Sequence, residues 1–337
     1  MERTNDIMHI VYASDDNFAE IMGVSIVSLF ENNKDTEDIV LYIFDSGISD
    51  INKKNINDIS KKYNRSLPVW ITAKNISDEL KIDVSMDRGS LSQYARLFVS
   101  SLLPESVKRV IYLDCDIIID KSIKELWQLD MQGMTIAALM DAFSRQYRRN
   151  INLKPDDIMF NSGVMLIDMD KWKERDIEKK LLDFIVSKKG VIQQGDQGAL
   201  NSILSKETYC FDPSYNSETV FYDFNYKEMM IYRKPPKFYS EAEIKNAVEN
   251  PVMIHFTTSF LSERPWIKGS KHIYADKWLY YKGLSPWKDS PLWEPKKRSP
   301  LKKVLFGVMK IMPRFMIVRL SGILHRYGRP LFYRIKS

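Results

Sequence analysis

Two aspartates interrupt a strongly apolar stretch near the middle of the chain. Residues 109–120 read RVIYLDCDIIID, and Asp114 and Asp116 stand one residue apart in its centre. The flanking β-branched residues are typical of a buried strand in a parallel sheet, where an ionised carboxylate costs several kcal/mol unless a cation meets it. Open α/β sheets bind their ligands at the carboxyl ends of the strands. We therefore predict a divalent metal ion at the end of this strand, with Asp114 and Asp116 as ligands.

The chain contains a second Asp-x-Asp pattern, which serves as an internal comparison. A chain of this composition is expected to contain about two such patterns by chance. The second one, Asp168-Met169-Asp170, follows VMLI and leads directly into KWKERDIEKKLLDF. Its acids are expected to cap a helix rather than bind a metal. The pattern alone therefore leaves a metal site and a structural role open for Asp114 and Asp116.

The composition indicates one large globular domain with an appendage. The 337 residues are 44% hydrophobic and 28% charged, with only 13 glycines, which argues against disorder, collagen and repeats. The two cysteines, Cys115 and Cys210, favour a reducing compartment, and we expect Cys115 to lie in the sheet as a small apolar residue. The start of the chain lacks a signal-peptide pattern, and no run of roughly 18 uncharged apolar residues occurs, so we expect neither export nor a membrane-spanning helix.

The C-terminal tail, residues 296–337, accounts for the excess of basic over acidic residues in the chain. It contains 12 Lys or Arg and no acid, so the preceding residues hold 38 basic and 44 acidic side chains. Apolar residues alternate with these charges, which predicts two short amphipathic helices separated at Pro313 on an anionic membrane surface. The alternative is a basic helical hairpin packed on the main domain. We expect a cytoplasmic protein on the inner face of the membrane, and no nucleic-acid partner.

The periodicity of the apolar residues alternates between strand and helix along the chain. This alternation predicts a doubly wound, mostly parallel sheet with helices on both faces. Neither a Gly-x-Gly-x-x-Gly nor a Walker loop follows the first strand, so a nucleotide or sugar phosphate is expected without dinucleotide binding or ATP hydrolysis. The predicted strands are residues 7–13, 39–44, 69–72, 109–120, 134–140 and 163–167, and the predicted helices are residues 18–32, 49–63, 91–101, 171–188 and one that begins near residue 197.

Six segments, taken in order, resemble glycosyltransferase family 8. They are VYASDDNF, QYARLFV, RVIYLDCDIIID, FNSGVMLIDMDKW, QQGDQGALN, and an IHF segment that ends in RPW. The resemblance spans Ile7 to Trp266 and implies the GT-A fold, a single Rossmann-like αβα sandwich. It also implies a retaining, metal-dependent enzyme that uses a UDP-sugar, as in bacterial lipopolysaccharide galactosyl- and glucosyltransferases. We assign residues 1–280 to this domain, 281–295 to an aromatic and proline-rich linker, and 296–337 to the tail.

The resemblance implies a nucleotide site at the end of the first strand. Ala13, Asp15 and Asn17 match the nucleotide contacts of the family, and a carboxylate or amide oxygen can accept the N3–H of uracil. The alternative is that Asp15 or Asp16 caps the following helix. Arg96 matches an arginine that reaches the sugar or the phosphates, and the alternative is a surface arginine.

The resemblance also adds a histidine to the metal site. His255, in VMIHF, matches the histidine ligand of the family and joins Asp114 and Asp116, while Cys115 is placed with them in the donor site. Nitrogen ligation favours Mn²⁺ over Mg²⁺, which stays the alternative. The ion would stabilise the charge that develops on the departing UDP.

Four further positions match residues that line the donor sugar in the family. Asn161, Asp196 and Gln197 belong to this group, and Asp141 resembles a sugar-contacting acid whose alternative is a helix cap. Retention ordinarily needs a nucleophile opposite the leaving group. Gln197 is a poor nucleophile, which is compatible with front-side attack, and Asp196 is the candidate for a covalent alternative.

One segment departs from the family pattern. The chain reads HFTTSFLSERPW, with Thr258 where the family has glycine and Arg264 in place of a lysine before Pro-Trp. Glycine permits close approach of the backbone to a phosphate, and threonine does not. Arg264 can still supply a cation and a bidentate contact to the diphosphate.

These patterns together predict a glycosyltransferase that moves galactose or glucose from a UDP-sugar to a cell-surface glycan, glycolipid or glycoprotein acceptor. One alternative is a nucleotidyltransferase that makes sugar nucleotides, although the first strand lacks the expected glycine-rich loop. The other is a non-catalytic membrane-associated module that binds nucleotide sugars. Because the predicted site residues all precede Trp266, a chain without residues 296–337 is expected to keep its donor hydrolysis.

Overall fold

The protein is described by a computed structural model, in which residues 7–85, 91–295 and 311–336 are placed. A seven-stranded sheet forms the centre, in the order β3-β2-β1-β4-β7-β6-β8. Its strands are parallel except β7, which runs antiparallel to both β4 and β6. This arrangement confirms the predicted GT-A-like α/β fold with a mostly parallel sheet. The strands are β1 (Ile7–Ser14), β2 (Asp38–Asp45), β3 (Val69–Thr72), β4 (Arg109–Leu113), β6 (Ile136–Met140), β7 (Phe160–Asp168) and β8 (Thr208–Cys210).

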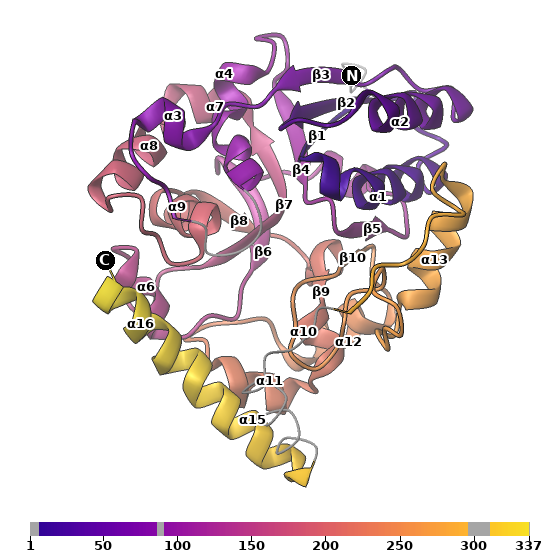
Figure 1. Ribbon diagram of the computed structural model, residues 1–337. Coiled ribbons are helices and arrows are strands. Elements are labelled where there is room, and N and C mark those ends of the chain that lie inside the picture. Colours follow the sequence, from indigo (N-terminus) through magenta and orange to yellow (C-terminus); the bar gives the residue numbers. More distant parts are fainter. Residues whose placement is uncertain (1–6, 86–90, 296–310, 337) are drawn as a thin grey trace.

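Two apolar cores cover the two faces of this sheet, which makes the domain a three-layered sandwich (Figure 1). Successive side chains of a strand point to opposite faces, so Ile10 and Tyr12 of β1 belong to one core and Val11 and Ala13 to the other. The first core is covered by α1 (Ala19–Glu31), α2 (Asp50–Lys62) and α13 (Ala275–Leu284), and the second by α3 (Ile76–Leu80), η2 (Leu91–Phe98), α4 (Val99–Leu102), α7 (Met169–Glu174), α8 (Ile177–Ser187) and α9 (Gly195–Leu204).

A second, three-stranded sheet extends the domain beyond the end of β4. It pairs β10 (Met253–His255) with β5 (Ile117–Ile119) on one side and with β9 (Ser217–Glu218) on the other. The apolar run 109–120 therefore forms two strands, β4 and β5, separated by a turn that holds the two aspartates. The remaining helices are α5 (Lys124–Trp127), α6 (Arg145–Asn150), α10 (Thr219–Asp223), α11 (Tyr226–Arg233) and α12 (Glu241–Glu249), with short helical turns η1 (Asp16–Phe18), η3 (Ser205–Glu207) and η4 (Pro213–Asn216).

Several local predictions need correction. The predicted helix 91–101 is mostly a 3₁₀ segment, η2, that continues into the short α4. The predicted helix 171–188 is two helices, because Asp176 adopts the left-handed conformation between them (φ +50°). Cys115 lies in the turn between β4 and β5 rather than in the sheet, although it is buried as expected. The predicted capping role of Asp168 is confirmed, since its carboxylate accepts a hydrogen bond from the Lys171 amide at 3.0 Å.

The tail forms one long helix from Arg314 to Lys336, which begins directly after Pro313. Its three segments are α15 (Arg314–Ile323), a π-helical turn η5 (Leu324–Gly328) and α16 (Arg329–Lys336). The helix packs against α11 and ends beside α6 (Figure 1). The predicted helix before Pro313 falls almost entirely on residues that lie outside the described part of the chain.

The segment before the tail is joined to the main domain by buried contacts. Helix α13 spans residue 280, the expected domain boundary. Lys282 is buried and pairs with Glu20 of α1 at 2.7 Å, and the Trp293 ring lies edge-on to Phe18. Within the described ranges, no helix combines the length and the apolar character needed to cross a bilayer.

Candidate active site

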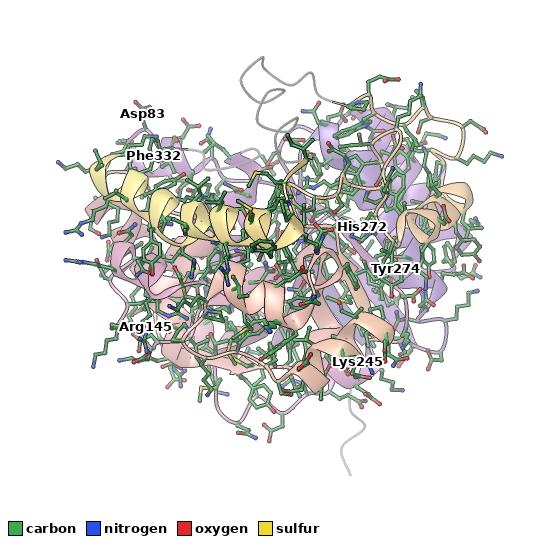
Figure 2. The ribbon with its side chains drawn as sticks, turned by 90° about the horizontal axis from the view of Figure 1, so that it is seen from below. Asp83, Arg145, Lys245, His272, Tyr274 and Phe332 are labelled. Carbon is green, nitrogen blue, oxygen red and sulfur yellow. The ribbon has the colours of Figure 1, made fainter. Side chains whose placement is uncertain are left out.

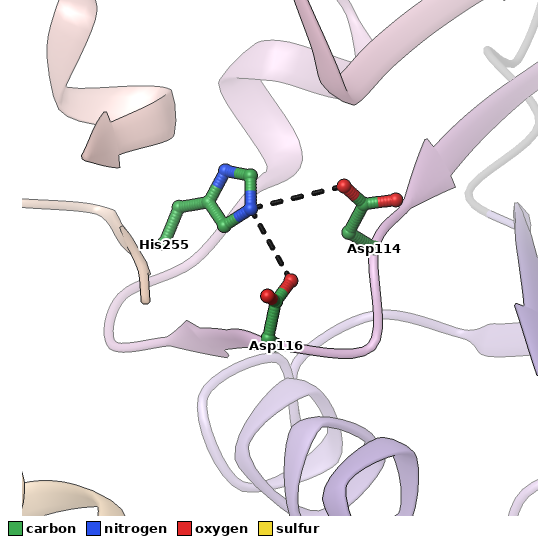
Figure 3. Close-up of side chains that lie close together, drawn as sticks. All are labelled: Asp114, Asp116 and His255. Carbon is green, nitrogen blue, oxygen red and sulfur yellow. Dashed lines mark ion pairs between the residues drawn. The ribbon is translucent and has the colours of Figure 1, made fainter. Parts of the chain in front are cut away.

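Asp114, Asp116 and His255 meet where β4 ends. Asp114 directly follows β4, Asp116 directly precedes β5, and His255 is the last residue of β10, which pairs with β5. The Nε2 atom of His255 lies 3.2 Å from Oδ1 of Asp116 and 3.7 Å from Oδ2 of Asp114 (Figure 3). The pairing of two short strands thus brings together residues that are far apart in the sequence.

These three side chains fit a divalent metal ion. Ligands at right angles around an ion with bonds of about 2.1 Å lie about 3 Å apart, which is close to the spacing of these atoms. Burial alone would raise the pKa of the Asp116 carboxyl, but His255 and Arg264 lower it to about 2. Burial alone would lower the pKa of His255, and the two aspartates together with Glu218 raise it. The two carboxylates thus favour a positive charge at the His255 ring, which a metal ion at Nε2 would supply in place of a proton.

Gly163, in the FNSG segment of β7, makes room for this cluster. A Cβ atom at this position would lie 2.3 Å from Cε1 of His255 and 2.9 Å from Oδ2 of Asp114. Both distances are well below van der Waals contact, so the two ligands can approach each other only because residue 163 has no side chain.

Arg96 lies on the other side of Asp114 and is buried. It donates to Oδ1 of Asp114 at 2.7 Å and to the Ser162 carbonyl at 2.8 Å, and its Nε lies 2.9 Å from Oδ2 of Asp196. Its guanidinium stacks on the Tyr112 ring, 4.3 Å from the centroid. The sequence-based alternative of a surface arginine is therefore wrong, because Arg96 orients one metal-facing carboxylate and neutralises a second acid.

A chain of buried amides fixes the orientation of His255. Its Nδ1 lies 2.9 Å from Oδ1 of Asn216, which assigns the ring proton to Nδ1 and leaves Nε2 to face the carboxylates. Asn216 donates to Oδ1 of Asn161 at 2.9 Å, and Asn161 donates to Oε1 of Glu218 at 2.8 Å. Burial, reinforced by Asp141, raises the pKa of Glu218 to about 8. Asn161 therefore connects the metal-facing histidine to a buried acid.

Gln197 and Asp196 lie in the first turn of α9. The Gln197 amide donates to Oδ2 of Asp141 at 3.3 Å, and its oxygen accepts from the Ser162 amide at 3.3 Å. Burial raises the pKa of Asp196 to about 6, against the lowering effect of Arg96. Asp141 is buried and does not cap helix α6, whose N-cap is Ser144, so the capping alternative for Asp141 is wrong.

The predicted nucleotide residues follow the end of β1, next to β4. The Cys115 thiol donates to the Ala13 carbonyl at 3.3 Å, which brings these two positions together. Asp15 accepts a hydrogen bond from the Asn17 backbone amide at 3.1 Å and is the N-cap of η1. Asp15 therefore has the capping role that was the alternative to a nucleotide contact. The structure thus joins Asp15 and Asn17 to each other rather than to Asp114, Asp116 or His255.

Arg264 reaches the candidate metal cluster (Asp114, Asp116 and His255) from the loop after β10. Its Nη2 lies 3.0 Å from Oδ2 of Asp116 and 3.1 Å from the Thr258 hydroxyl, and its guanidinium stacks on the Trp266 ring. The two residues that depart from the family pattern thus bond to each other, and they place a cation beside the metal-facing carboxylate.

Sequence reasoning missed four residues of this region. Asn216 and Glu218 belong to the polar NSE run that leads into β9, and the polar character of a buried strand was an available signal. Arg233 and His325 lie on α11 and η5. Only tertiary packing brings His325 to Arg233 and Arg233 to the Phe143 ring beside Asp141, so no local signal could have found them.

Comparison with known proteins agrees with this fold and with the family resemblance of the sequence. The family model for glycosyl transferase family 8 matches residues 9–268. General stress protein A of Bacillus subtilis is 31% identical over 288 residues, 85% of this chain and 96% of that protein. Lipopolysaccharide 1,2-glucosyltransferase of Escherichia coli is 28% identical, over 85% of this chain and 80% of that protein. A crystal structure of the galactosyltransferase LgtC with donor and acceptor sugar analogues superposes with a TM-score of 0.70 at 24% identity, and covers 83% of this chain and 96% of that one.

The family match shows that the protein is a glycosyltransferase, and the acidic and histidine side chains at the end of β4 form a candidate site for a divalent metal. This chain belongs to glycosyltransferase family 8, as its sequence motifs indicated.

Proposed function

We propose that this protein transfers galactose or glucose from a UDP-sugar to a cell-surface glycan acceptor, with Mn²⁺ at Asp114, Asp116 and His255 and with retention of the anomeric configuration. The observation that carries this proposal is the convergence of two carboxylate oxygens and one imidazole nitrogen at the end of β4. One nitrogen and two oxygen ligands favour Mn²⁺ over Mg²⁺. When bound by these three residues, such an ion would stabilise the negative charge on the departing UDP.

The chain's own residues would hold the donor around this point. We assign Ala13, Asp15 and Asn17 to the nucleotide. Arg264 lies beside the metal-facing carboxylate of Asp116 and is assigned to the diphosphate, where a guanidinium can form bidentate contacts with phosphate oxygens. The Cys115 thiol donates to the Ala13 carbonyl, and we assign Cys115 to the donor site on that basis.

The arrangement around Gln197 favours front-side attack. Asp196 is engaged by Arg96 at 2.9 Å, so its role is to fix that arginine rather than to attack the sugar. Gln197 is held between Ser162 and Asp141 and presents an amide, which is too weak a nucleophile to form a covalent intermediate. The departing phosphate is then the base that accepts the acceptor's proton, while Asn161, Asp141 and Gln197 orient the sugar.

The outer side of the tail helix supports an anionic membrane surface as the place of action. Figure 2 shows this helix lying along the surface of the molecule, with Phe332 near its C-terminal end. Phe315, Leu324, Phe332 and Ile335 are each at least 60% exposed, and arginines and a lysine lie among them. Exposed apolar and basic side chains on one helix are typical of an interfacial anchor. The acceptor is accordingly proposed to be a membrane-linked glycan or glycolipid.

The test is hydrolysis of UDP-glucose, UDP-galactose and UDP-N-acetylglucosamine by the full chain without acceptor, with Mn²⁺ and with EDTA. Turnover of at least one donor that requires Mn²⁺ is expected, and Asp116→Asn should abolish both turnover and Mn²⁺-dependent UDP binding in calorimetry. Asp170→Asn, in the second Asp-x-Asp pattern, is the matched control, because Asp170 is an exposed partner of Lys108. Unchanged Mn²⁺-dependent UDP affinity in Asp116→Asn would remove the metal site from this proposal.

A further inference from the structure

The tail helix makes a polar contact toward the candidate active site. Arg233, at the end of α11, donates from Nη1 to Nε2 of His325 at 2.8 Å. His325 belongs to the π-helical turn η5, and such turns in an α-helix often occur at functional positions. His325 contacts Arg233 and Tyr147 of the main domain, while its neighbour Leu324 is 66% exposed.

Backbone contacts fix this turn on the main domain. The Tyr147 hydroxyl donates to the carbonyl of His325 at 3.1 Å, and the side chain of Asn150 donates to the carbonyl of Pro330 at 2.8 Å. Gly322 lies against the backbone of α11, where a Cβ atom would be 3.1 Å from Cα of Tyr232. The His325 ring stacks on the Tyr147 ring, with centroids 5.2 Å apart. His325 is therefore held from both helices that flank the tail.

Arg233 in turn lies near Asp141, an acid assigned to the sugar end of the site, because its guanidinium lies over the Phe143 ring, 5.2 Å from the centroid, and the Phe143 amide donates to the Asp141 carbonyl at 2.9 Å. Its charge lowers the pKa of both Asp141 and Glu218 against the effect of burial, which raises both. Asp141 accepts from the Gln197 amide, and Glu218 accepts from the Asn161 amide. The described residues include no ion pair within 4 Å between Arg233 and either acid, and the buried Nε of Arg233 has no protein hydrogen-bond partner among them.

We infer that the C-terminal helix completes the active site, with His325 as a positioning residue that holds Arg233 opposite Asp141 and Glu218. This inference rests on the proposed function and extends it, because it makes a tail residue part of the machinery that orients the sugar. Without His325, the guanidinium of Arg233 is free to rotate away from Asp141 toward solvent, and the Asp141 carboxylate that accepts from Gln197 loses a fixed counter-charge.

This arrangement revises the expectation that the tail can be removed without loss of catalysis. The residues that contact the donor precede Trp266, but Arg233 is oriented by a residue 92 positions further along the chain. Removal of the helix would also expose the buried ring of Tyr147 and the surface of α11. The tail then has two proposed roles. Its outer side contacts the membrane, and His325 on its inner side orients Arg233.

The experiment is a double-mutant cycle in the full-length protein. Donor hydrolysis is measured for wild type, His325→Ala, Arg233→Ala and the double variant, with Leu324→Ala as the matched control on the outer side of the same turn. We expect each single variant to lower kcat about 10- to 100-fold, as for a misplaced orienting group, with the KM for Mn²⁺ within about twofold of wild type. Because His325 acts through Arg233, the double variant should be no slower than Arg233→Ala. Leu324→Ala should retain wild-type kcat.

The pH profile provides a readout that a merely structural role would not move. Asp141 is faced by Arg233 of α11, Arg148 of α6, Gln197 of α9 and Glu218 of β9. Loss of the Arg233 charge lets burial raise the Asp141 pKa further, so the acidic limb of kcat should move to higher pH in Arg233→Ala and in His325→Ala. His325→Gln retains an acceptor toward Arg233 and should recover most of the rate.

Two outcomes would overturn the inference while leaving the proposed function intact. In the first, wild type turns over the donor and His325→Ala is equally fast. In the second, the effects of the two substitutions are additive in kcat, and the acidic limb does not move. A wild-type chain that hydrolyses no UDP-sugar with Mn²⁺ would overturn the proposed function itself, and this inference with it.

Discussion

Replacement of Gly163 by alanine is the most direct perturbation of the metal-facing cluster. Gly163 does not have a positive φ, so alanine can adopt its backbone conformation and the effect is purely steric. The new Cβ would lie 2.3 Å from Cε1 of His255 and 2.9 Å from Oδ2 of Asp114, whereas carbon atoms in contact are about 3.5 Å apart. His255 must therefore move by about 1 Å. Misplacement by that amount costs about 100-fold in rate, and disturbed ligand orientation costs about 10- to 100-fold in metal affinity.

The assay is a Mn²⁺ titration in the presence of UDP, in which the signal of free Mn²⁺ in electron paramagnetic resonance reports the unbound ion. Gly163→Ala should weaken Mn²⁺ binding by about 10- to 100-fold and lower the free energy of unfolding by about 1–3 kcal/mol through overpacking. Gly283→Ala is the matched control, because Gly283 lies in α13 and a Cβ atom added there would meet no described atom within 4 Å. If Gly163→Ala binds Mn²⁺ as tightly as the control and turns over donor at the same rate, Asp114, Asp116 and His255 do not bind the metal ion in the proposed way.

Three further predictions concern the mechanism, the buried acid and the tail. Gln197→Ala should slow transfer without any sugar bound covalently to the protein, and NMR of the product should show the anomeric configuration of the donor; an inverted product would exclude front-side attack. Glu218 has a folded pKa of about 8 against 4.5 when exposed, so its burial destabilises the metal-free protein progressively from about pH 4.5 up to pH 8. Glu218→Gln should therefore raise the Tm more at about pH 8 than at about pH 5, and an equal gain at both would contradict the assignment. Binding of the full chain to anionic vesicles should weaken when Phe332 and Ile335 are replaced by serine. It should also weaken with salt, because the Debye length falls from about 10 Å at 0.1 M to about 3 Å at 1 M. If neither change affects sedimentation with the vesicles, the tail does not bind a membrane surface.

Local sequence pattern was sufficient for most of the central sheet. The apolar run before Asp114 is a strand because its β-branched residues fit a pleated surface that is buried on both faces. Asp168 caps a helix because a carboxylate next to the first amides of a helix is stabilised wherever the helix lies. Predictions failed where local pattern and tertiary contact compete: apolar periodicity favoured one helix over residues 171–188, and the left-handed Asp176 divides it.

In the candidate site, too, local pattern identified some residues, and other contacts depend on the tertiary structure. The sequence by itself indicated that Asp114 and Asp116 need a cation, because two acids in the middle of an apolar run can be buried only where a positive charge compensates them. It predicted one strand over residues 109–120, whereas in the structure this run is divided into β4 and β5 at the aspartates. The ordered motifs added His255, Arg96 and the residues of α9. Motif matching could not determine that Arg96 bridges Asp114 and Asp196, since both contacts depend on the packing of η2 against the ends of β4 and α9.

Only the tertiary structure decided how the described part of the tail packs on the domain. Its composition is compatible with a membrane anchor and with a packed helix, because an amphipathic helix has one apolar side whether water, lipid or protein covers it. The fold decides by placing α11 and α6 beside it: Val318 and Gly322 are buried there, and His325 meets Arg233 across a distance in sequence that no local pattern records. The physical reason is that the energy of a polar contact depends on the separation of the atoms and on their burial, and both quantities exist only once the chain is folded.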